Sequence, residues 1–241
     1  PFHNHLKENG AVFGELAGWE RANWFANPGQ DPSYAYSWKR QNFFDNVAAE
    51  HKAVRSNLGL YDMSSFGKIR VEGQDACAFM NYIGGGQYDV PLGKIVYTQF
   101  LNDRAGIEAD VTVTRLSETC YLVVTPAATR LADQTWMMRH KGAFNVVITD
   151  VTAGEAVLAV MGPNARKLLE RVSPNDFSNA HNPFGTAQEI ELGMGLARAH
   201  RVTYVGELGW EVYVSADMAG HAFETIWQAG QEMEAKLCGM H

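Results

Sequence analysis

YTQFLNDRAGIEADVTVTRL, running from Tyr97 to Leu116, carries the clearest structural signal in this chain. It ends on the alternating residues Val111-Thr112-Val113-Thr114, which have the period of a strand with one buried face. A turn-like piece over 102–106 comes before that strand. Asp110 stands between the two as a lone acid where the strand begins. The carboxylate is either a functional group or a strand-start residue that bonds local amides, and the local sequence is compatible with both.

The segments on either side alternate between helical and extended patterns. Apolar residues near helical spacing predict a helix over Asn42–Asn57, which Gly59 follows closely. Several connections are too short for helical crossovers, so neighbouring strands are expected to be antiparallel. The sequence therefore predicts an α+β fold made of small lobes with mixed or antiparallel sheets. Further helices are expected over 74–83, 127–140, 164–172 and 220–234, and strands within 59–73 and over 95–100, 110–115, 120–124, 144–149, 156–161, 196–204 and 210–214.

The N-terminal segment, residues 1–42, is expected to be an irregular linker that wraps over a surface. Residues 10–42 are rich in aromatics, glycine and proline. These aromatics are interpreted as anchors for a chain with little regular structure of its own. A ligand-binding aromatic cluster is the alternative.

Composition excludes several classes of protein. The net charge of −7 argues against a surface that tracks nucleic-acid phosphates. No apolar run approaches the roughly 20 residues of a membrane helix, so no membrane association is expected. Cys77, Cys120 and Cys238 are odd in number and widely spaced, which favours reduced, buried thiols over a disulfide framework or a zinc site. The 8 histidines are scattered, so no metal site is predicted.

Familiar catalytic signatures do not occur in these residues. GxGxxG between a strand and a helix, GxxxxGK[ST], HExxH and GxSxG are all missing, so no dinucleotide site is expected within this chain. Three stretches remain that combine acids, tyrosines and turns: Tyr61–Gly73, Tyr97–Leu116 and Val202–Val214. In the third, Glu211 and Tyr213 share one strand face. An acid at such a position is unusual because ionised carboxylates are rarely buried without a partner.

In this order and spacing, the three stretches resemble the tetrahydrofolate-binding aminomethyltransferase family, whose best-known member is the T-protein of the glycine cleavage system. The resemblance runs from about residue 58 to about residue 227. Its pieces are Tyr97–Asp103, Gly106-Ile107, Asp110, Val123-Val124, Met161-Gly162-Pro163 and Tyr204–Glu211. In addition, Gly10–Phe25 resembles the segment that joins the flavin-bearing and folate-bearing halves of dimethylglycine and sarcosine dehydrogenases.

The resemblance implies a role for each acid. Asp110 corresponds to the family's catalytic aspartate, which accepts a proton from a folate nitrogen as that nitrogen takes up a one-carbon unit. Glu108 is a weaker competitor for this role because it shares the strand face of Asp110. Glu211 is expected to accept the paired N–H donors of the pterin ring. Glu207 is either a second folate contact or a solvated turn residue. The remaining folate contacts expected are Tyr97, Tyr204, Met63, Val124 and Thr125.

The resemblance also implies an architecture and a function. The aminomethyltransferase fold surrounds a central folate site. The folate-binding domain is expected over 43–235, with an inserted lobe at about 57–148 and a discontinuous lobe at about 43–56 and 149–235. An FAD domain upstream and a further lobe beyond His241 are expected to lie outside this chain.

The function expected is the folate-binding part of a flavin-dependent N-methylglycine dehydrogenase, which passes the carbon released from a methylated amine to tetrahydrofolate. A T-protein-type aminomethyltransferase, which needs a lipoyl carrier protein, is the alternative. A non-catalytic folate-binding protein is the second. The expected compartment is reducing: the bacterial cytoplasm, or the mitochondrial matrix in a eukaryote.

Overall fold

The computed structural model describes all residues, 1–241, and its elements group into two compact units. Unit 1 comprises Pro1–Ser64, Ala156–Phe184 and Glu189–His241, and unit 2 comprises Ser65–Glu155 and Gly185–Gln188. Unit 1 is therefore discontinuous in sequence, and most of unit 2 is one continuous insertion. The lobe boundaries expected from the sequence stay a prediction.

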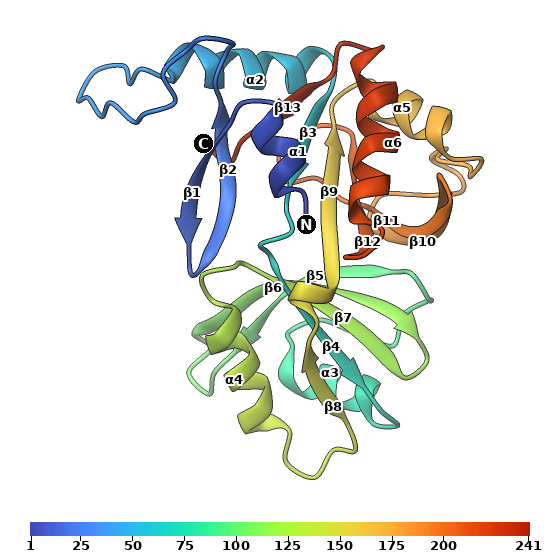
Figure 1. Cartoon of the computed structure of the whole chain (residues 1–241). Helices are drawn as coiled ribbons and strands as arrows, with labels where there is room; N and C mark the ends of the chain where they lie inside the picture. Colours follow the sequence, from blue (N-terminus) through green and yellow to red (C-terminus); the bar gives the residue numbers. More distant parts are fainter. The chain divides into compact units, whose positions relative to one another are not determined.

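Unit 2 is built on a five-stranded antiparallel sheet with the strand order β5-β6-β7-β4-β8. Both of its helices, α3 (Ala76–Ile83) and α4 (Arg130–His140), lie on the same side of the sheet (Figure 1). The strands are β4 (Gly67–Glu72), β5 (Ile95–Leu101), β6 (Ile107–Ser117), β7 (Cys120–Thr125) and β8 (Val147–Asp150). A 3₁₀ turn, η1 (Thr152–Gly154), follows β8.

The period of two in β6 decides which side chains the helices of unit 2 cover. Ala109, Val111 and Val113 are buried in the core that Phe79 of α3 and Met137 of α4 complete. Successive strand residues point to opposite faces, so Asp110 lies on the face away from that core. The alternation seen in the sequence is therefore confirmed, with Asp110 on the side that α3 and α4 leave uncovered.

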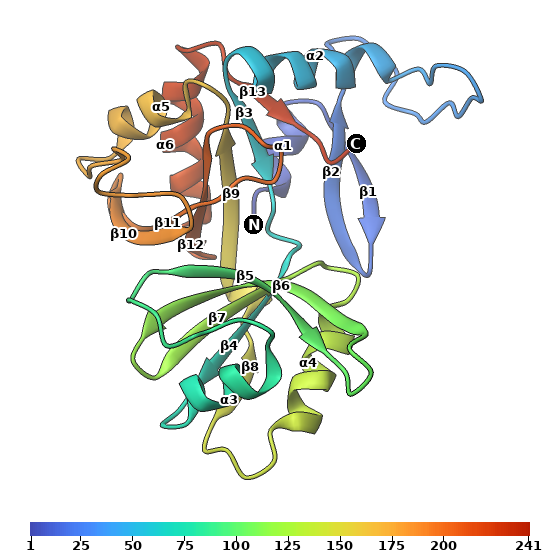
Figure 2. The ribbon, with the colours of Figure 1, turned by 180° about the vertical axis from the view of Figure 1, so that it is seen from behind.

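Unit 1 is built on a six-stranded sheet with the strand order β10-β11-β12-β9-β3-β13. Strand β13 pairs with β3 in parallel, whereas the pairs β3–β9 and β11–β12 are antiparallel. The strands are β3 (Gly59–Asp62), β9 (Glu155–Met161), β10 (Thr186–Leu192), β11 (Gly195–Arg201), β12 (Gly209–Ser215) and β13 (Lys236–Cys238). Figure 2 shows these strands from behind.

The core of unit 1 forms between one face of this sheet and its helices. Trp210, Val212 and Val214 of β12 are buried there. They pack with side chains from α5 (Ala165–Val172) and α6 (Ala219–Gln231). The expected sharing of faces on β12 is confirmed, because Glu211 alternates with these core residues. The helix expected over Asn42–Asn57 is also confirmed as α2 (Phe44–Ser56).

The expectation of an irregular segment over 1–42 is wrong for its first half. A short helix, α1 (His3–Glu8), is followed by the antiparallel hairpin of β1 (Ala11–Leu16) and β2 (Trp19–Phe25). The hairpin turns at Ala17 and Gly18, both at positive φ, 52° and 84°. This is the two-residue turn that suits the twist of a hairpin, but Ala-Gly is a weaker signal for it than Asn-Gly. The aromatic residues beyond β2 lie in a segment without helix or strand, as expected.

A buried carboxylate ties this hairpin to the rest of unit 1. Glu50 of α2 is 5% exposed, and its two oxygens accept the backbone N–H groups of Phe25 and Gly239, each at 2.9 Å. Burial raises the pKa of Glu50, and the two N–H donors oppose that shift. One side chain thus joins three segments that are remote in sequence.

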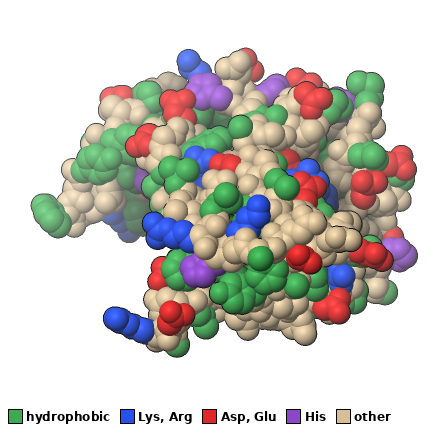
Figure 3. Space-filling view, turned by 90° about the horizontal axis from the view of Figure 1, so that it is seen from below, with side chains coloured by type: hydrophobic (Ala, Val, Ile, Leu, Met, Phe, Trp, Pro, Cys, Tyr) green, Lys and Arg blue, Asp and Glu red, His purple; other side chains and the backbone are tan.

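The surface, the thiols and the helices add three observations. Figure 3 shows acidic and basic side chains intermixed on the face it displays. Cys120 and Cys238 are buried and Cys77 is half-buried, all as free thiols. None of the helices combines the length and the apolar character that crossing a membrane requires.

Candidate functional site

Two polar side chains on β5 hold the Asp110 carboxylate of unit 2. Tyr97 donates its hydroxyl hydrogen to Asp110 Oδ2 at 2.9 Å, and the Gln99 amide donates to Asp110 Oδ1 at 2.9 Å. Strand register explains both contacts, because Gln99 lies directly opposite Asp110 and Tyr97 lies opposite Thr112. Both carboxylate oxygens therefore act as acceptors, and the carboxylate is held in one orientation on an exposed strand surface.

The Tyr97 hydroxyl is kept in its protonated, donating form. The hydrogen bond to Asp110 raises the pKa of Tyr97, because a phenolate would face a carboxylate. Tyr97 is 68% exposed, so its ring presents a flat aromatic surface beside the carboxylate. A carboxylate beside an exposed aromatic ring can accept a proton from a planar ligand that stacks on the ring.

Gln99 is a functional candidate that the sequence analysis missed. Its side chain is half-buried and lies two residues after Tyr97, on the same face of β5. The period of two from Tyr97 was the available signal. Glu108, the weaker candidate for the proton acceptor, is held by a different side chain. The Asn102 amide donates to its Oε1 at 2.6 Å and ties Glu108 to the turn before β6.

Two neighbouring residues of β7 point to opposite faces of the unit 2 sheet. Val124 lies opposite Thr112 in the register of β6 and β7, on the face of Asp110, and is 9% exposed. Thr125 is 1% exposed, and its hydroxyl hydrogen-bonds with Asp133 of α4. Strand alternation turns the Thr125 side chain toward α4, on the opposite face of the sheet from Asp110 and Val124. The expected contact of Thr125 with folate stays a prediction.

Glu211 in unit 1 lies in a second polar cluster, on the hairpin of β11 and β12. Tyr213 donates its hydroxyl hydrogen to Glu211 Oε2 at 2.7 Å. The register of the hairpin sets His200 opposite Glu211 and Arg198 opposite Tyr213, so all four side chains share the face away from the core. Tyr213 and His200 are buried, and Glu211 is half-buried.

The loop between β11 and β12 carries two further candidates. Tyr204 is 64% exposed and lines a pocket of about 270 Å³ within unit 1, together with residues of α2 and the segment 238–241. Glu207 forms an ion pair with Arg55 of α2 at 2.5 Å, and its side chain is 18% exposed. The interpretation of Glu207 as a solvated turn residue is therefore wrong, because a cation 152 positions away in sequence covers it.

Met63 lies at the end of β3 and is 4% exposed. Its backbone N–H bonds the carbonyl of Val157 at 2.9 Å, so this end of the strand is fixed. The structure thus brings Tyr97, Gln99 and Asp110 together in unit 2, and Arg198, His200, Glu211 and Tyr213 together in unit 1.

The family described as the GCVT N-terminal domain matches residues 2–241, and the chain belongs to this family. Among solved structures, the glycine cleavage system aminomethyltransferase T from Bartonella henselae shares the fold, with a TM-score of 0.79 and 24% identity. That likeness covers 100% of this chain and 59% of the other.

Curated relatives are longer than this chain. It is 45% identical to the 4-methylaminobutanoate oxidase (formaldehyde-forming) of Paenarthrobacter nicotinovorans over 241 residues, which are 100% of this chain and 29% of the relative. It is 32% identical to the mitochondrial dimethylglycine dehydrogenase of Rattus norvegicus over 230 residues, which are 94% of this chain and 27% of the relative. The chain therefore spans less than a third of the length of either protein.

Proposed function

We propose that these 241 residues act as the folate-binding portion of a flavin-dependent N-methylamino-acid oxidase or dehydrogenase. Tetrahydrofolate would take up the one-carbon unit that leaves the methylated amine, giving 5,10-methylenetetrahydrofolate. The observation that carries the proposal is the Asp110 carboxylate, held by Tyr97 and Gln99 on the face of its sheet away from α3 and α4. Membership of the family and the names of the two relatives support it.

The donor set of unit 2 suits this chemistry. Bound tetrahydrofolate supplies nucleophilic nitrogens, and one of them loses a proton as its bond to the one-carbon unit forms. Asp110 would accept that proton, because a carboxylate within hydrogen-bond reach is an effective general base. Tyr97 and Gln99 would keep the carboxylate oriented while the demethylated amine departs.

The acid in unit 1 suits recognition of the ligand. The pterin ring presents its exocyclic amino group and N3–H as two adjacent donors, and a carboxylate accepts both at once. Within unit 1, Glu211 would fill this role and Tyr204 would contact the flat ring. Met63 and Glu207, whose carboxylate pairs with Arg55, would be further folate contacts of this unit. Within unit 2, Tyr97 and Val124 are the proposed folate contacts. The FAD that oxidises the amine would belong to another domain of the same polypeptide.

The identity of the methylated amine has to be measured, and the relatives indicate which amines to test. The names of the two relatives point to N-methylated amino acids, with 4-methylaminobutanoate and dimethylglycine as the first to try. Sarcosine is the third amine to test.

The test uses the full-length polypeptide that contains these residues. Each amine is supplied with and without tetrahydrofolate, and free formaldehyde and 5,10-methylenetetrahydrofolate are measured in the same reaction. We expect tetrahydrofolate to shift the released carbon from formaldehyde to methylenetetrahydrofolate without changing the rate of amine oxidation. Formaldehyde release that is unchanged at saturating tetrahydrofolate contradicts the proposal. Activity that depends on a lipoyl carrier protein would point to a T-protein-type aminomethyltransferase.

A further inference from the structure

The Glu211 carboxylate is oriented by a buried neighbour on its own strand. Tyr213 lies two residues after Glu211, on the same face of β12, and its hydroxyl donates to Glu211 Oε2 at 2.7 Å. Tyr213 is only 3% exposed. A hydrogen bond from a buried, fixed donor restricts rotation of the carboxylate, so the direction of its lone pairs is set before a ligand arrives.

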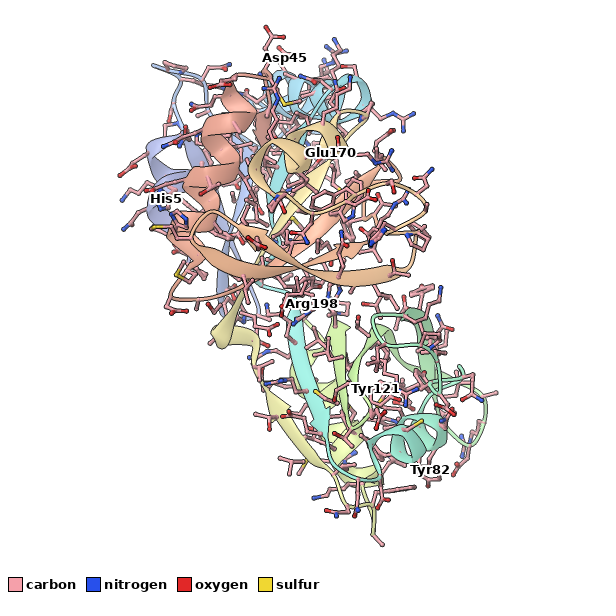
Figure 4. All side chains as sticks on the ribbon, turned by 90° about the vertical axis from the view of Figure 1, so that its right-hand side faces the viewer. His5, Asp45, Tyr82, Tyr121, Glu170 and Arg198 are labelled. Carbon is pink, nitrogen blue, oxygen red and sulfur yellow. The ribbon has the colours of Figure 1, made fainter.

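Two residues of β11 in turn hold the Tyr213 ring. The His200 imidazole stacks on it with ring centroids 4.2 Å apart, and the Arg198 guanidinium lies 5.5 Å from its centroid. Arg198 also donates from its Nε to Nε2 of His200 at 3.0 Å. Figure 4 labels Arg198. The cluster therefore has a fixed order, from Arg198 through His200 and Tyr213 to Glu211.

The histidine in this cluster is neutral. His200 is 2% exposed, and burial together with the nearby Arg198 cation lowers the pKa of its imidazole well below the ordinary value. Because Nε2 accepts the hydrogen from Arg198, the ring proton lies on Nδ1. A protonated ring would point an N–H at the guanidinium, so the hydrogen bond from Arg198 requires the neutral form.

We propose that Tyr213 is a positioning residue, held by His200 and Arg198, that fixes Glu211 to receive a heterocycle with two adjacent N–H donors. This inference rests on the proposed function, because the aminopyrimidinone edge of a pterin is the ligand edge in question. It assigns a specificity-determining role to a buried tyrosine that need not touch the ligand itself.

The test compares tetrahydrofolate with an analogue whose 2-amino group is replaced by methyl, by calorimetry on the full-length protein. Tyr213→Phe keeps the stacked ring and removes only the donor. We expect it to weaken tetrahydrofolate binding by about 2–10-fold, the scale of one hydrogen bond. We also expect the preference for tetrahydrofolate over the analogue to shrink. In a Glu211→Gln background, Tyr213→Phe should have almost no further effect, because its action passes through Glu211.

A matched control separates positioning from general destabilisation. Tyr121 in unit 2 is also a buried tyrosine, and its hydroxyl donates to the Tyr88 carbonyl at 2.8 Å. Tyr121→Phe should lower the melting temperature and leave both affinities unchanged. If Tyr213→Phe is too unstable to assay, His200→Gln provides a second variant that removes the stacked ring. It should weaken tetrahydrofolate binding in a Glu211-dependent way as well.

Three outcomes separate failure of the proposed function from failure of the inference about Tyr213. Wild-type protein that does not bind tetrahydrofolate overturns the proposed function and the inference together. Binding that Glu211→Gln weakens and Tyr213→Phe leaves unchanged overturns the inference alone. An equal loss from Tyr213→Phe with and without Glu211 also overturns it, because the tyrosine would then act through packing.

Discussion

Asp110 in unit 2 and Glu211 in unit 1 occupy similar local positions and have opposite surroundings. Each lies on a strand between core-facing residues, and each accepts a tyrosine hydroxyl hydrogen. The tyrosine at Asp110 is 68% exposed, whereas the one at Glu211 is 3% exposed. A carboxylate on an open surface can exchange a proton with ligand and solvent. A carboxylate backed by a buried cluster is better suited to hold a fixed set of donors.

This contrast assigns different kinetic signatures to the two acids. Loss of the proton acceptor should lower the rate of the chemical step at saturating ligand. Loss of the recognising acid should lower affinity and leave the step at saturation nearly intact. Variants at the two sites therefore test whether the two acids differ in role.

The largest effect is expected for Asp110→Asn in the full-length protein. Formation of methylenetetrahydrofolate should fall by about 10²–10⁴, the usual contribution of a positioned general base, while amine oxidation continues and the carbon appears as free formaldehyde. Glu108→Gln is the matched control, because Glu108 is exposed on the same strand and bonded to Asn102. Suppose that the Glu108 variant loses methylenetetrahydrofolate formation while it still oxidises the amine, and that the Asp110 variant does not. The proton acceptor has then been assigned to the wrong acid.

Glu211→Gln should have the next largest effect. The substitution keeps the size of the side chain and replaces one acceptor by a donor that opposes the donors of the ligand. Affinity for tetrahydrofolate should fall by about 1–3 kcal/mol, the scale of a hydrogen bond to a charged group, in titration calorimetry. The rate at saturating tetrahydrofolate should stay within about 2-fold of wild type. A fall in rate without a fall in affinity would make Glu211 part of the chemical step and remove the contrast with Asp110.

A third prediction concerns pH and the buried cluster behind Glu211. The pKa of His200 is lower in the folded protein than its ordinary 6.5, so the unfolded chain binds the proton more tightly. The contribution of neutral His200 to stability is therefore present above pH 6.5 and is lost as the pH falls below it. The free energy of unfolding should decline by up to about 1.4 kcal/mol per pH unit below that point.

His200→Gln isolates this pH effect, because glutamine can accept the hydrogen bond from Arg198 and does not titrate. Urea unfolding of both proteins between pH 5 and pH 7 gives the two slopes. The steeper decline should belong to the wild type. The pKa of His241 is also lowered, but it affects both proteins equally, so the difference in slope belongs to His200. Equal slopes would mean that His200 titrates normally in the folded protein.

The sequence predicted which face of its own strand a side chain lies on, and not which side chain of a partner strand it contacts. The face of Asp110 and the shared face of Glu211 and Tyr213 follow from a period of two within one segment, whereas the roles proposed for Asp110 and Glu211 come from the family resemblance. The contact of Gln99 with Asp110 and the contact of His200 with Tyr213 require the register between two strands. The ion pair of Glu207 with Arg55 joins a loop to a remote helix, and no local pattern encodes it. The early hairpin was missed because its turn, Ala17-Gly18, lacks the usual residues.

The smallest effect is expected at Gln99, and it tests whether orientation of Asp110 contributes to the rate. Gln99→Leu removes the donor to Oδ1 and leaves Tyr97 bonded to Oδ2, so the carboxylate gains rotational freedom without losing its charge. The rate of one-carbon transfer at saturating tetrahydrofolate should fall by about 2–10-fold, the scale of one hydrogen bond, and affinity should not change. Tyr97→Phe should have an effect of similar size, and the double variant should lose more than either alone while staying above Asp110→Asn. Single-turnover kinetics on the wild type and these four variants gives this order. A double variant no slower than wild type would show that Asp110 needs no orientation, and the difference between the two acids would then rest on exposure alone.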